Sequence, residues 1–521
     1  MPCKHDSTSS CPWCRPQLSL CMIVRDAART LEPCLESIRP WVDEIVIVDT
    51  GSVDQTLEIA ERYQARVFHF PWCDDFSAAR NESLRYASGE WIFWMDADDT
   101  IDAANGHKLR GLVDQDHHEN TLGYVVQVHC PATGEGQDFT AVDHVKLIRN
   151  RPDLRFEGRI HEQILSAIRN AGGDTAWTDI FVTHSGSDQS AEGRRKKHER
   201  DLRILHLDHQ ERPEHPFVLF NLGMTYADME QYEKAVDWLQ QSIARAQPPE
   251  SHLRKAYALL ASSLYQLGRK AEAKDVCERG LKVASNDPEL LFRKAMLAHE
   301  AGSLEEAEAA YRQALKPSVE RHFASIDMGI IGAKARHNLA CVYADMNRDD
   351  LAEIQYRRAV RTKRCTASGP VLIASLIRQR KFTSAELELE WLEQNSLEVW
   401  QVLLLRSQLH EAQGSLTKAR DLLTEATSRF SDKPDVWEAL ARFLFERDEL
   451  DQAVEPLSEL VDLEPHNAAA WHNLGIAKLR GGDLPGAQAA LRVSLDLRPE
   501  SNSTREALQE ASQVVREQVA I

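Results

Sequence analysis

The stretch Trp91-Ile92-Phe93-Trp94-Met95-Asp96-Ala97-Asp98-Asp99 joins an apolar run to three carboxylates within four positions. The apolar run is typical of a buried strand, and the acids follow at its carboxyl end. Carboxylates crowded in this way repel one another unless a positive charge neutralises them. Hard divalent cations such as Mg2+ and Mn2+ accept oxygen ligands of this type. The stretch therefore predicts a metal site at the end of a strand.

Similar apolar runs recur through the first hundred residues and alternate with helical patterns. They cover residues 18–24, 44–49, 66–70 and 90–96. Strands that alternate with helices are typical of a parallel sheet, and right-handed crossovers bring the carboxyl ends of its strands to one edge. We therefore expect Asp49 and the acidic cluster to face the same crevice, where open α/β sheets bind ligands, most often a nucleotide.

Glycine is scarce in this region. The first hundred residues contain only Gly51 and Gly89, and neither a G-x-G-x-x-G nor a G-x-x-x-x-G-K-[ST] pattern is present. A diphosphate bound at this edge would have to be neutralised by a metal and by side chains, because a glycine-rich phosphate loop is missing. This argues against a dehydrogenase and against a P-loop NTPase.

Four motifs, in order and at matching spacing, resemble family 2 glycosyltransferases. They are Leu-Cys-Met-Ile-Val-Arg at 20–25, Val-Ile-Val-Asp-Thr-Gly-Ser-Val-Asp-Gln-Thr at 46–56, Phe-Ser-Ala-Ala-Arg-Asn at 76–81 and Met-Asp-Ala-Asp-Asp at 95–99. The resemblance is strong over residues 18–100 and fades over 100–190. It implies an α/β GT-A fold, which is Rossmann-like, a nucleotide-diphosphate sugar donor and inversion at the anomeric carbon.

The resemblance also implies roles for three aspartates. Asp49 would contact the nucleoside, Asp96 would lie near the ribose and the metal, and Asp98 would bind the metal that bridges the diphosphate. Departure of a nucleoside diphosphate builds negative charge on the leaving oxygen, and a metal stabilises that charge as a Lewis acid. Asp99 would orient its neighbours.

Four further residues are candidates for the donor site, each with a structural alternative. Asp54 contacts the donor or, as we favour, caps the helix that follows it. Arg80, on a helix over 76–87, pairs with Asp96 or with a phosphate. Trp72 and Asp75 contact the sugar, or they are a buried aromatic ring and a solvated acid.

An inverting transfer also needs a general base that accepts a proton from the acceptor. The resemblance places Glu162 there, in the stretch 156–163, although a His-Glu pair replaces the more usual Glu-Asp. Glu157 is the rival base, and His161 orients one of these acids or is structural. His184 ends another apolar run at the position of a late metal-binding histidine, and it either ligates the metal or is structural.

A period of 34 residues marks the second half of the chain. Trp437 and Trp471 are separated by this distance, as are Ala453 and Ala487, and Pro465 and Pro499. The period is that of tetratricopeptide (TPR) repeats, of which roughly eight fit, with an insertion at 318–335 and a degenerate copy at 371–396. Such an array forms a superhelix whose concave face recruits a peptide or protein acceptor or partner, or mediates homodimerisation.

The expected organisation has five parts. They are an N-terminal tail at 1–17, a GT-A domain at 18–190, a basic helical linker at 191–214, a TPR superhelix at 215–510 and a C-terminal tail at 511–521. The arginine and lysine side chains that begin at Arg194 either face a donor phosphate or form a solvated helix face. We favour the solvated face, because Glu199 and Asp201 interleave with the basic residues.

The composition of the whole chain narrows its partners. Its net charge of −19, from 62 basic and 81 acidic residues among 521, argues against nucleic acid and anionic membranes as main partners. No apolar run of about 18 residues predicts a transmembrane segment, and no secretory signal is recognised, so we expect a cytoplasmic protein. The ten scattered cysteines are then reduced.

One N-terminal cluster departs from that scatter. Tetrahedral Zn2+ accepts ligands of the kind found at Cys3, His5, Cys11 and Cys14. The close spacing of Cys3 and His5 is unusual for a zinc finger, and a disordered tail explains the same residues.

The sequence therefore predicts an inverting glycosyltransferase that uses Mn2+ or Mg2+ and a nucleotide-sugar donor. One alternative is a TPR protein-binding scaffold with an inactive transferase-like domain. Another is a sugar nucleotidyltransferase, which the absence of a glycine-rich loop after the first strand disfavours.

Overall fold

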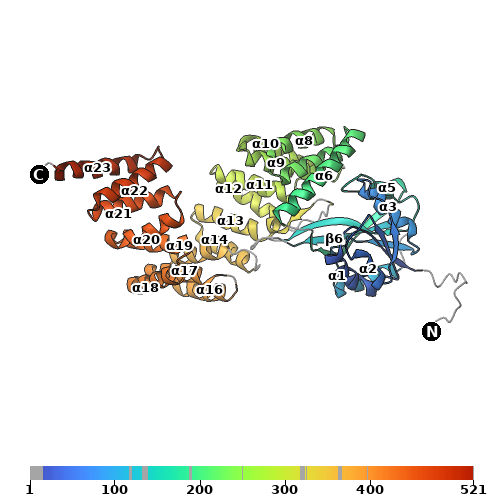
Figure 1. The fold of residues 1–521 in the computed structure, drawn as a ribbon, viewed down its shortest axis with the longest axis horizontal. Coiled ribbons are helices and arrows are strands. Elements are labelled where there is room, and N and C mark those ends of the chain that lie inside the picture. The colour runs from blue at the N-terminus through green and yellow to red at the C-terminus, as the bar shows by residue number, and fades with distance from the viewer. Residues whose placement is uncertain are drawn as a thin grey trace, which may run out of the picture. The chain divides into compact units, whose positions relative to one another are not determined.

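The computed structural model describes residues 16–115, 120–131, 139–186, 190–248, 250–316, 323, 325–361, 367–395 and 397–519. The chain divides into two compact units, Met1–Met346 and Asn347–Ile521, which are described separately (Figure 1). The zinc candidates Cys3, His5, Cys11 and Cys14 lie outside the described residues.

The first unit is built on a mixed sheet with the strand order β3-β2-β1-β4-β7-β6-β8-β5. The four predicted parallel strands are present as β1 (Leu18–Val24), β2 (Glu44–Asp49), β3 (Arg66–His69) and β4 (Trp91–Trp94). The sheet continues through the longer strands β6 (Thr121–Cys130), β7 (Thr140–Arg149) and β8 (Asp174–His184), and through β5 (Asp99–Thr100). Strand β7 runs antiparallel to both β4 and β6, whereas β6 pairs parallel with β8, so the sheet is mixed beyond the four predicted parallel strands.

Helices cover both faces of the sheet, which explains why its strands read as continuous apolar runs. They are α1 (Ala28–Ile38), α2 (Thr56–Arg62), α3 (Phe76–Tyr86), α4 (Ala103–Val113) and α5 (Leu165–Asn170). Successive residues of β1 point to opposite faces: Leu20 joins the core cluster with Leu31 of α1, whereas Cys21 joins the cluster with Leu84 of α3.

The carboxyl ends of the parallel strands meet at one edge, as predicted. Val24 pairs with Asp49, and Cys21 pairs with Trp94. The chain leaving β4 remains attached to this edge, because the Met95 N–H donates to the carbonyl of Cys21 at 3.3 Å. Asp49 and the acidic turn after β4 therefore lie at the same edge.

The segment expected to be a basic linker contains one long helix, α6 (Ala191–Glu211). The helices that follow it form the start of the repeat array. They are α7 (Pro216–Asp228), α8 (Tyr232–Arg245), α9 (Leu253–Gln266), α10 (Lys270–Val283), α11 (Pro288–Glu300), α12 (Leu304–Ala314) and α13 (Ala333–Asp345). Within the pair α7 and α8 the backbones approach closely, since a Cβ on Gly223 would lie 2.6 Å from Leu239.

All the secondary structure described in the second unit is helical. Its helices are α14 (Asp349–Val360), α15 (Ser368–Arg378), α16 (Phe382–Asn395), α17 (Val399–Ala412), α18 (Leu416–Arg429), α19 (Pro434–Phe445), α20 (Leu450–Leu463), α21 (Ala468–Arg480), α22 (Leu484–Leu497) and α23 (Asn502–Val519). The 34-residue period has a structural counterpart, because Trp437 and Trp471 each donate from Nε1 at 2.9 Å to the carbonyl six residues earlier.

The repeat array also contributes to the sheet of the first unit. Between α12 and α13, where the sequence predicts an insertion, the two-residue strand β9 (Ile326–Asp327) pairs antiparallel with β7. Its partners are Ala141 for Ile326 and Thr140 for Asp327. One residue before β9, the carbonyl of Ser325 accepts a hydrogen bond from Nζ of Lys255 on α9 at 2.9 Å. The insertion thus connects the repeat helices to the sheet.

No helix in the described part of the chain combines the length and the apolar composition that crossing a bilayer requires.

Candidate active site

The acidic turn after β4 is closed by the last residue of β8. Asp99 pairs with His184 in the register of β5 and β8, and the Ser185 N–H donates to the Asp98 carbonyl at 2.9 Å. Asp96, Asp99 and His184 consequently bring one potential ligand atom each to within 4.8 Å of the others. Nδ1 of His184 also lies 3.4 Å from Oδ1 of Asp98.

The carboxylates of this cluster are neutralised by nearby positive charge to different extents. Burial and the neighbouring carboxylates raise the pKa of Asp98, although His184 opposes the rise. Burial also disfavours the charged form of Asp99, but Lys146 and His184 outweigh it and lower the pKa of Asp99. The hydrogen bond to Asp99 raises the pKa of His184. Asp99 is therefore neutralised by the protein, whereas Asp98 is not.

Lys146 is a buried member of the site that the sequence analysis missed. The pairing of β6 with β7 matches Tyr124 to Leu147 and Val125 to Val145, so Lys146 is the extra residue of a β-bulge. Its Nζ lies 2.7 Å from Oδ2 of Asp99 and 3.9 Å from the centroid of the Trp94 ring. The available signal was a lysine inside the apolar run at 145–148.

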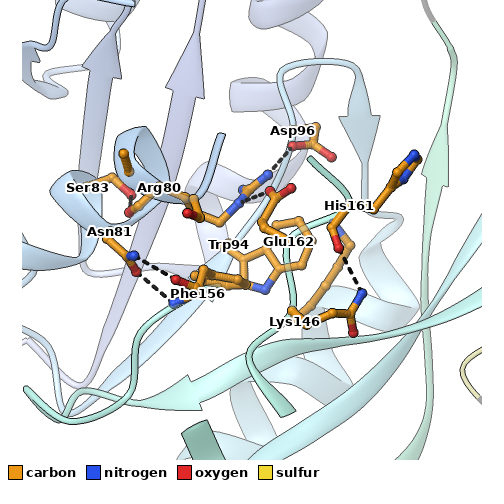
Figure 2. Close-up of polar contacts among 12 residues, drawn as sticks. Arg80, Asn81, Ser83, Trp94, Asp96, Lys146, Phe156, His161 and Glu162 are labelled. Atoms are coloured by element: carbon orange, nitrogen blue, oxygen red, sulfur yellow. Dashed lines mark hydrogen bonds and ion pairs between the residues drawn. The ribbon is translucent and has the colours of Figure 1, made fainter. Parts of the chain in front are cut away.

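Arg80 connects the acidic turn to Glu162 (Figure 2). From α3, its Nε donates to Oε1 of Glu162 at 2.7 Å and its Nη2 donates to Oδ1 of Asp96 at 3.1 Å. The guanidinium lies 4.1 Å from the Trp94 ring centroid. Burial opposes the charge of Arg80, but Glu162 and Asp96 raise the pKa of the guanidinium. Of the two predicted partners, the ion pair with Asp96 is the one present.

The two candidate bases occupy different surroundings. The Glu162 side chain is 11% exposed and is joined to Asp96 through Arg80. Glu157 is exposed, and its backbone forms an isolated bridge with Gln163. Between them, His161 has a φ of 55°, a left-handed conformation that non-glycine residues seldom adopt. Of the two described acids, only Glu162 is linked to the acidic turn.

Asp49 and Asp54 shape the loops at the carboxyl edge. Asp49 is 3% exposed and accepts hydrogen bonds from the N–H groups of Ser52 at 3.0 Å and Gly51 at 3.1 Å. Burial opposes its ionisation, but these bonds lower the pKa of Asp49. Asp54 accepts from the first helical N–H of α2, at Thr56, and from that of α1, at Ala28, each at 3.0 Å. Asp54 thus caps α2 from the residue before its formal N-cap, Gln55.

Trp72 and Asp75 have structural contacts at this edge. Asp75 is the N-cap of α3 and accepts from the Ala78 N–H at 2.9 Å. Trp72 donates from Nε1 to Asp74 at 2.7 Å, and its ring packs in a cluster with Ile204 of α6. Both residues thus have partners within the protein, and their contact with a sugar stays a prediction.

The basic face of α6 is largely paired with acids. Arg203 pairs with Asp74, Arg200 lies 2.7 Å from Asp201, and Lys196 lies 2.7 Å from Glu192. Such pairs favour a solvated helix face over a phosphate-binding one.

Comparisons with known proteins agree with this architecture. Residues 19–165 match the model of glycosyl transferase family 2. Models of tetratricopeptide repeats match residues 218–248, 258–319, 333–370, 372–434 and 434–477. The chain therefore carries a family 2 glycosyltransferase domain of GT-A fold, followed by tetratricopeptide repeats.

Two curated relatives each match a little under half of this chain. A TPR repeat-containing protein of Synechococcus elongatus is 34% identical over 238 residues, which are 44% of this chain and 58% of the relative. The SPbeta prophage-derived glycosyltransferase SunS of Bacillus subtilis is 24% identical over 258 residues, which are 48% of this chain and 59% of the relative. The chain thus spans less than three fifths of either relative.

Among solved structures, a tetratricopeptide repeat protein from Parabacteroides merdae matches with a TM-score of 0.38 and 14% identity. The match covers 57% of this chain and 98% of the chain of that protein.

Proposed function

We propose that this protein is a metal-dependent, inverting glycosyltransferase that moves a sugar from a nucleotide-diphosphate donor to a nucleophile on an acceptor. The observation that carries the proposal is the convergence of Asp96, Asp98, Asp99 and His184 at the carboxyl edge of a family 2 sheet. Ligands of open α/β sheets bind at this edge.

The donor set fits Mn2+ or Mg2+. Carboxylate oxygens suit both ions, and an imidazole nitrogen is accepted more readily by Mn2+. Asp99 is already neutralised by Lys146, so Asp96, Asp98 and His184 are the residues that would hold the ion. The raised pKa of Asp98 supports this assignment, because burial and then the carboxylates of Asp96 and Asp99 disfavour its charged form, which a bound cation would stabilise. When bound, the ion would act as a Lewis acid toward the diphosphate.

The remaining roles are assigned to residues of this chain. Glu162 accepts the proton of the attacking acceptor group as the general base. Arg80 orients Glu162 and keeps it close to Asp96. Asp49, at the end of β2, contacts the nucleoside or holds the loop that does so. The donor base and sugar depend on pocket shape.

The repeats recruit a peptide or protein acceptor. A TPR array offers an extended concave surface for such a segment, and β9 links the repeat helices of the first unit to the catalytic sheet. Self-association through the same surface is the alternative use of the array.

The test is a panel of UDP, GDP and dTDP sugars supplied with Mn2+, with release of the nucleoside diphosphate as the readout. We expect release with at least one donor and its loss in Asp98→Ala. Asp114→Ala is the matched control, because Asp114 is an acid paired with Arg110 at the end of α4. Equal turnover in Asp98→Ala and wild type, with both folded by circular dichroism, would contradict the metal role. No release with any donor would favour the inactive scaffold.

A further inference from the structure

Both carboxylate oxygens of Asp99 are bonded within the protein. Its Oδ1 lies 2.9 Å from Nδ1 of His184, and its Oδ2 accepts from Nζ of Lys146 at 2.7 Å and from the Asp96 N–H at 3.2 Å. The Asp99 side chain is 1% exposed, compared with 19% for Asp98 and 40% for Asp96. Asp99 is therefore enclosed by donors of the protein, whereas the other two aspartates remain accessible to an ion.

The bond between Asp99 and His184 determines which nitrogen of the imidazole is available to a metal. Because Asp99 binds Nδ1, the other ring nitrogen, Nε2, is left for the ion. Metal-binding histidines commonly have a carboxylate on their second ring nitrogen, and this carboxylate fixes the tautomer and the orientation of the ring. Asp99 is thus suited to orient His184 and not to bind the ion itself.

Lys146 holds Asp99 in this role from the opposite oxygen. As the extra residue of the bulge in β7, it carries a positive charge into the sheet, where its side chain is 1% exposed. Its Nζ also lies 3.9 Å from the centroid of the Trp94 ring, whose face attracts a cation (Figure 2). The charge of Asp99 is therefore balanced inside the protein before any ion binds.

We propose that Lys146 is a positioning residue for the metal ion of the transferase. It keeps Asp99 bonded to His184 and outside the ligand set, and its charge lowers the affinity of the acidic turn for a bare divalent ion. The inference rests on the proposed function, because that function supplies the ion.

A lowered affinity suits an ion that must also bind a diphosphate. The affinity of an oxygen site for a divalent cation depends on the charge of its ligands. With Asp99 neutralised, Asp96 and Asp98 are the carboxylates that remain for the ion. Magnesium sites with one or two carboxylates are usually completed by phosphate groups of the substrate. Lys146 thereby leaves part of the ion's charge and coordination to the donor.

The test measures Mn2+ binding to the full-length protein without nucleotide or sugar, from the electron paramagnetic resonance signal of free Mn2+. In Lys146→Met the Asp99 carboxylate loses its cation, so we expect Mn2+ to bind on the order of tenfold more tightly than in wild type. A merely structural role predicts the opposite sign, because a distorted turn binds the ion less tightly. Unchanged or weaker binding in folded Lys146→Met would overturn the inference.

The double variant Lys146→Met/Asp99→Asn provides a second measurement that does not require the single variant to fold. It removes both charges, and the amide oxygen can still accept from His184, so we expect an affinity within about threefold of wild type. A loss of about tenfold or more would show that Asp99 itself binds the ion and would overturn the inference.

Lys108→Met is the matched control. It removes a lysine whose Nζ lies 2.6 Å from Asp179 in an exposed pair on α4, and it should bind Mn2+ as wild type does. A gain of affinity in this variant equal to that of Lys146→Met would show that the effect is one of overall charge, and it would overturn the inference.

The outcomes separate this role from the proposed function. Mn2+ affinity that rises in Lys146→Met, in a protein that releases no nucleoside diphosphate from any donor, would remove the function and keep the role of Lys146. Release of diphosphate by wild type, with equal Mn2+ affinity in wild type and Lys146→Met, would keep the function and overturn the role.

Discussion

Lys146 and Asp99 form an ion pair in which Nζ lies 2.7 Å from Oδ2 and each side chain is 1% exposed. Asp99 also accepts from the Asp96 N–H at 3.2 Å and lies 2.9 Å from Nδ1 of His184. One buried pair thus connects the bulge of β7 to the acidic turn and to the end of β8. Asp98 and Asp96 are positioned by a neighbour whose own charge is already neutralised.

Replacing Lys146 with methionine should destabilise the first unit. The change leaves the buried Asp99 carboxylate without its cation, which costs about 3–5 kcal/mol in comparable sites. Urea denaturation monitored by tryptophan fluorescence measures the loss. The double variant Lys146→Met/Asp99→Asn removes both charges and should recover more than half of it. A single variant as stable as wild type would show that the pair contributes nothing.

Replacing Glu162 with glutamine should lower the kcat of sugar transfer by about 10²–10⁴ while donor KM stays nearly constant. The amide oxygen still accepts a hydrogen bond from Arg80, but the side chain no longer takes a proton. Initial rates at varied donor and acceptor concentrations separate the two constants. Glu157→Gln is the control and should retain wild-type kcat. If the Glu157 variant loses activity instead, the base has been misassigned.

A chain that ends at Met346 should separate acceptor recruitment from catalysis. It stops at the boundary between the units and keeps β9, which a cut before residue 215 would remove. We expect metal-dependent release of diphosphate to persist. Labelling of lysate proteins from an azide-bearing donor sugar should fall about tenfold or more, because the second unit is missing. Circular dichroism establishes that the shorter chain folds, and undiminished labelling would argue against recruitment by the second unit.

Acidification should destabilise the repeats through His252. This residue is 6% exposed and packs against Phe217 and Phe220, and burial followed by the neighbouring His215 lowers its pKa to about 4. The unfolded chain binds a proton near pH 6.5 and the folded chain only near pH 4. Stability is therefore highest above pH 6.5 and falls toward pH 4, by about 1.4 kcal/mol per pH unit inside that window.

Thermal denaturation of His252→Phe across pH 4 to 7 checks this prediction, because this range spans the pKa of His252 in the unfolded and in the folded chain. The variant should show a shallower dependence of Tm on pH than wild type. His466→Ala, which changes an exposed histidine, should leave the wild-type dependence intact. Parallel curves for wild type and His252→Phe would contradict the assignment.

Local sequence patterns were sufficient to predict the parallel strands and the repeats. The strand predictions at 18–24 and 44–49 match β1 and β2, because strands buried on both faces consist of consecutive apolar residues. The position of the acids at the carboxyl edge could be predicted because the crossovers between parallel strands are almost always right-handed. The 34-residue period was visible because each repeat needs the same small and large residues at its helix crossings.

Contacts between distant segments left no such pattern. Lys146 enters the site through a bulge whose register depends on β6, and a lone lysine in an apolar run does not reveal it. Arg80 and Glu162 are 82 positions apart, so their bond follows from the packing of α3 and not from spacing. Strand β9 has two residues, too few for any alternation to be read.

The short strand β9 limits how far this chain can be treated as two interchangeable modules. Grafting the repeats onto another transferase, or exchanging them for a foreign array, would strip Thr140 and Ala141 of their pairing partners. A chimera that keeps this transferase domain should therefore also keep residues 325–331, although they lie between two repeat helices in the sequence.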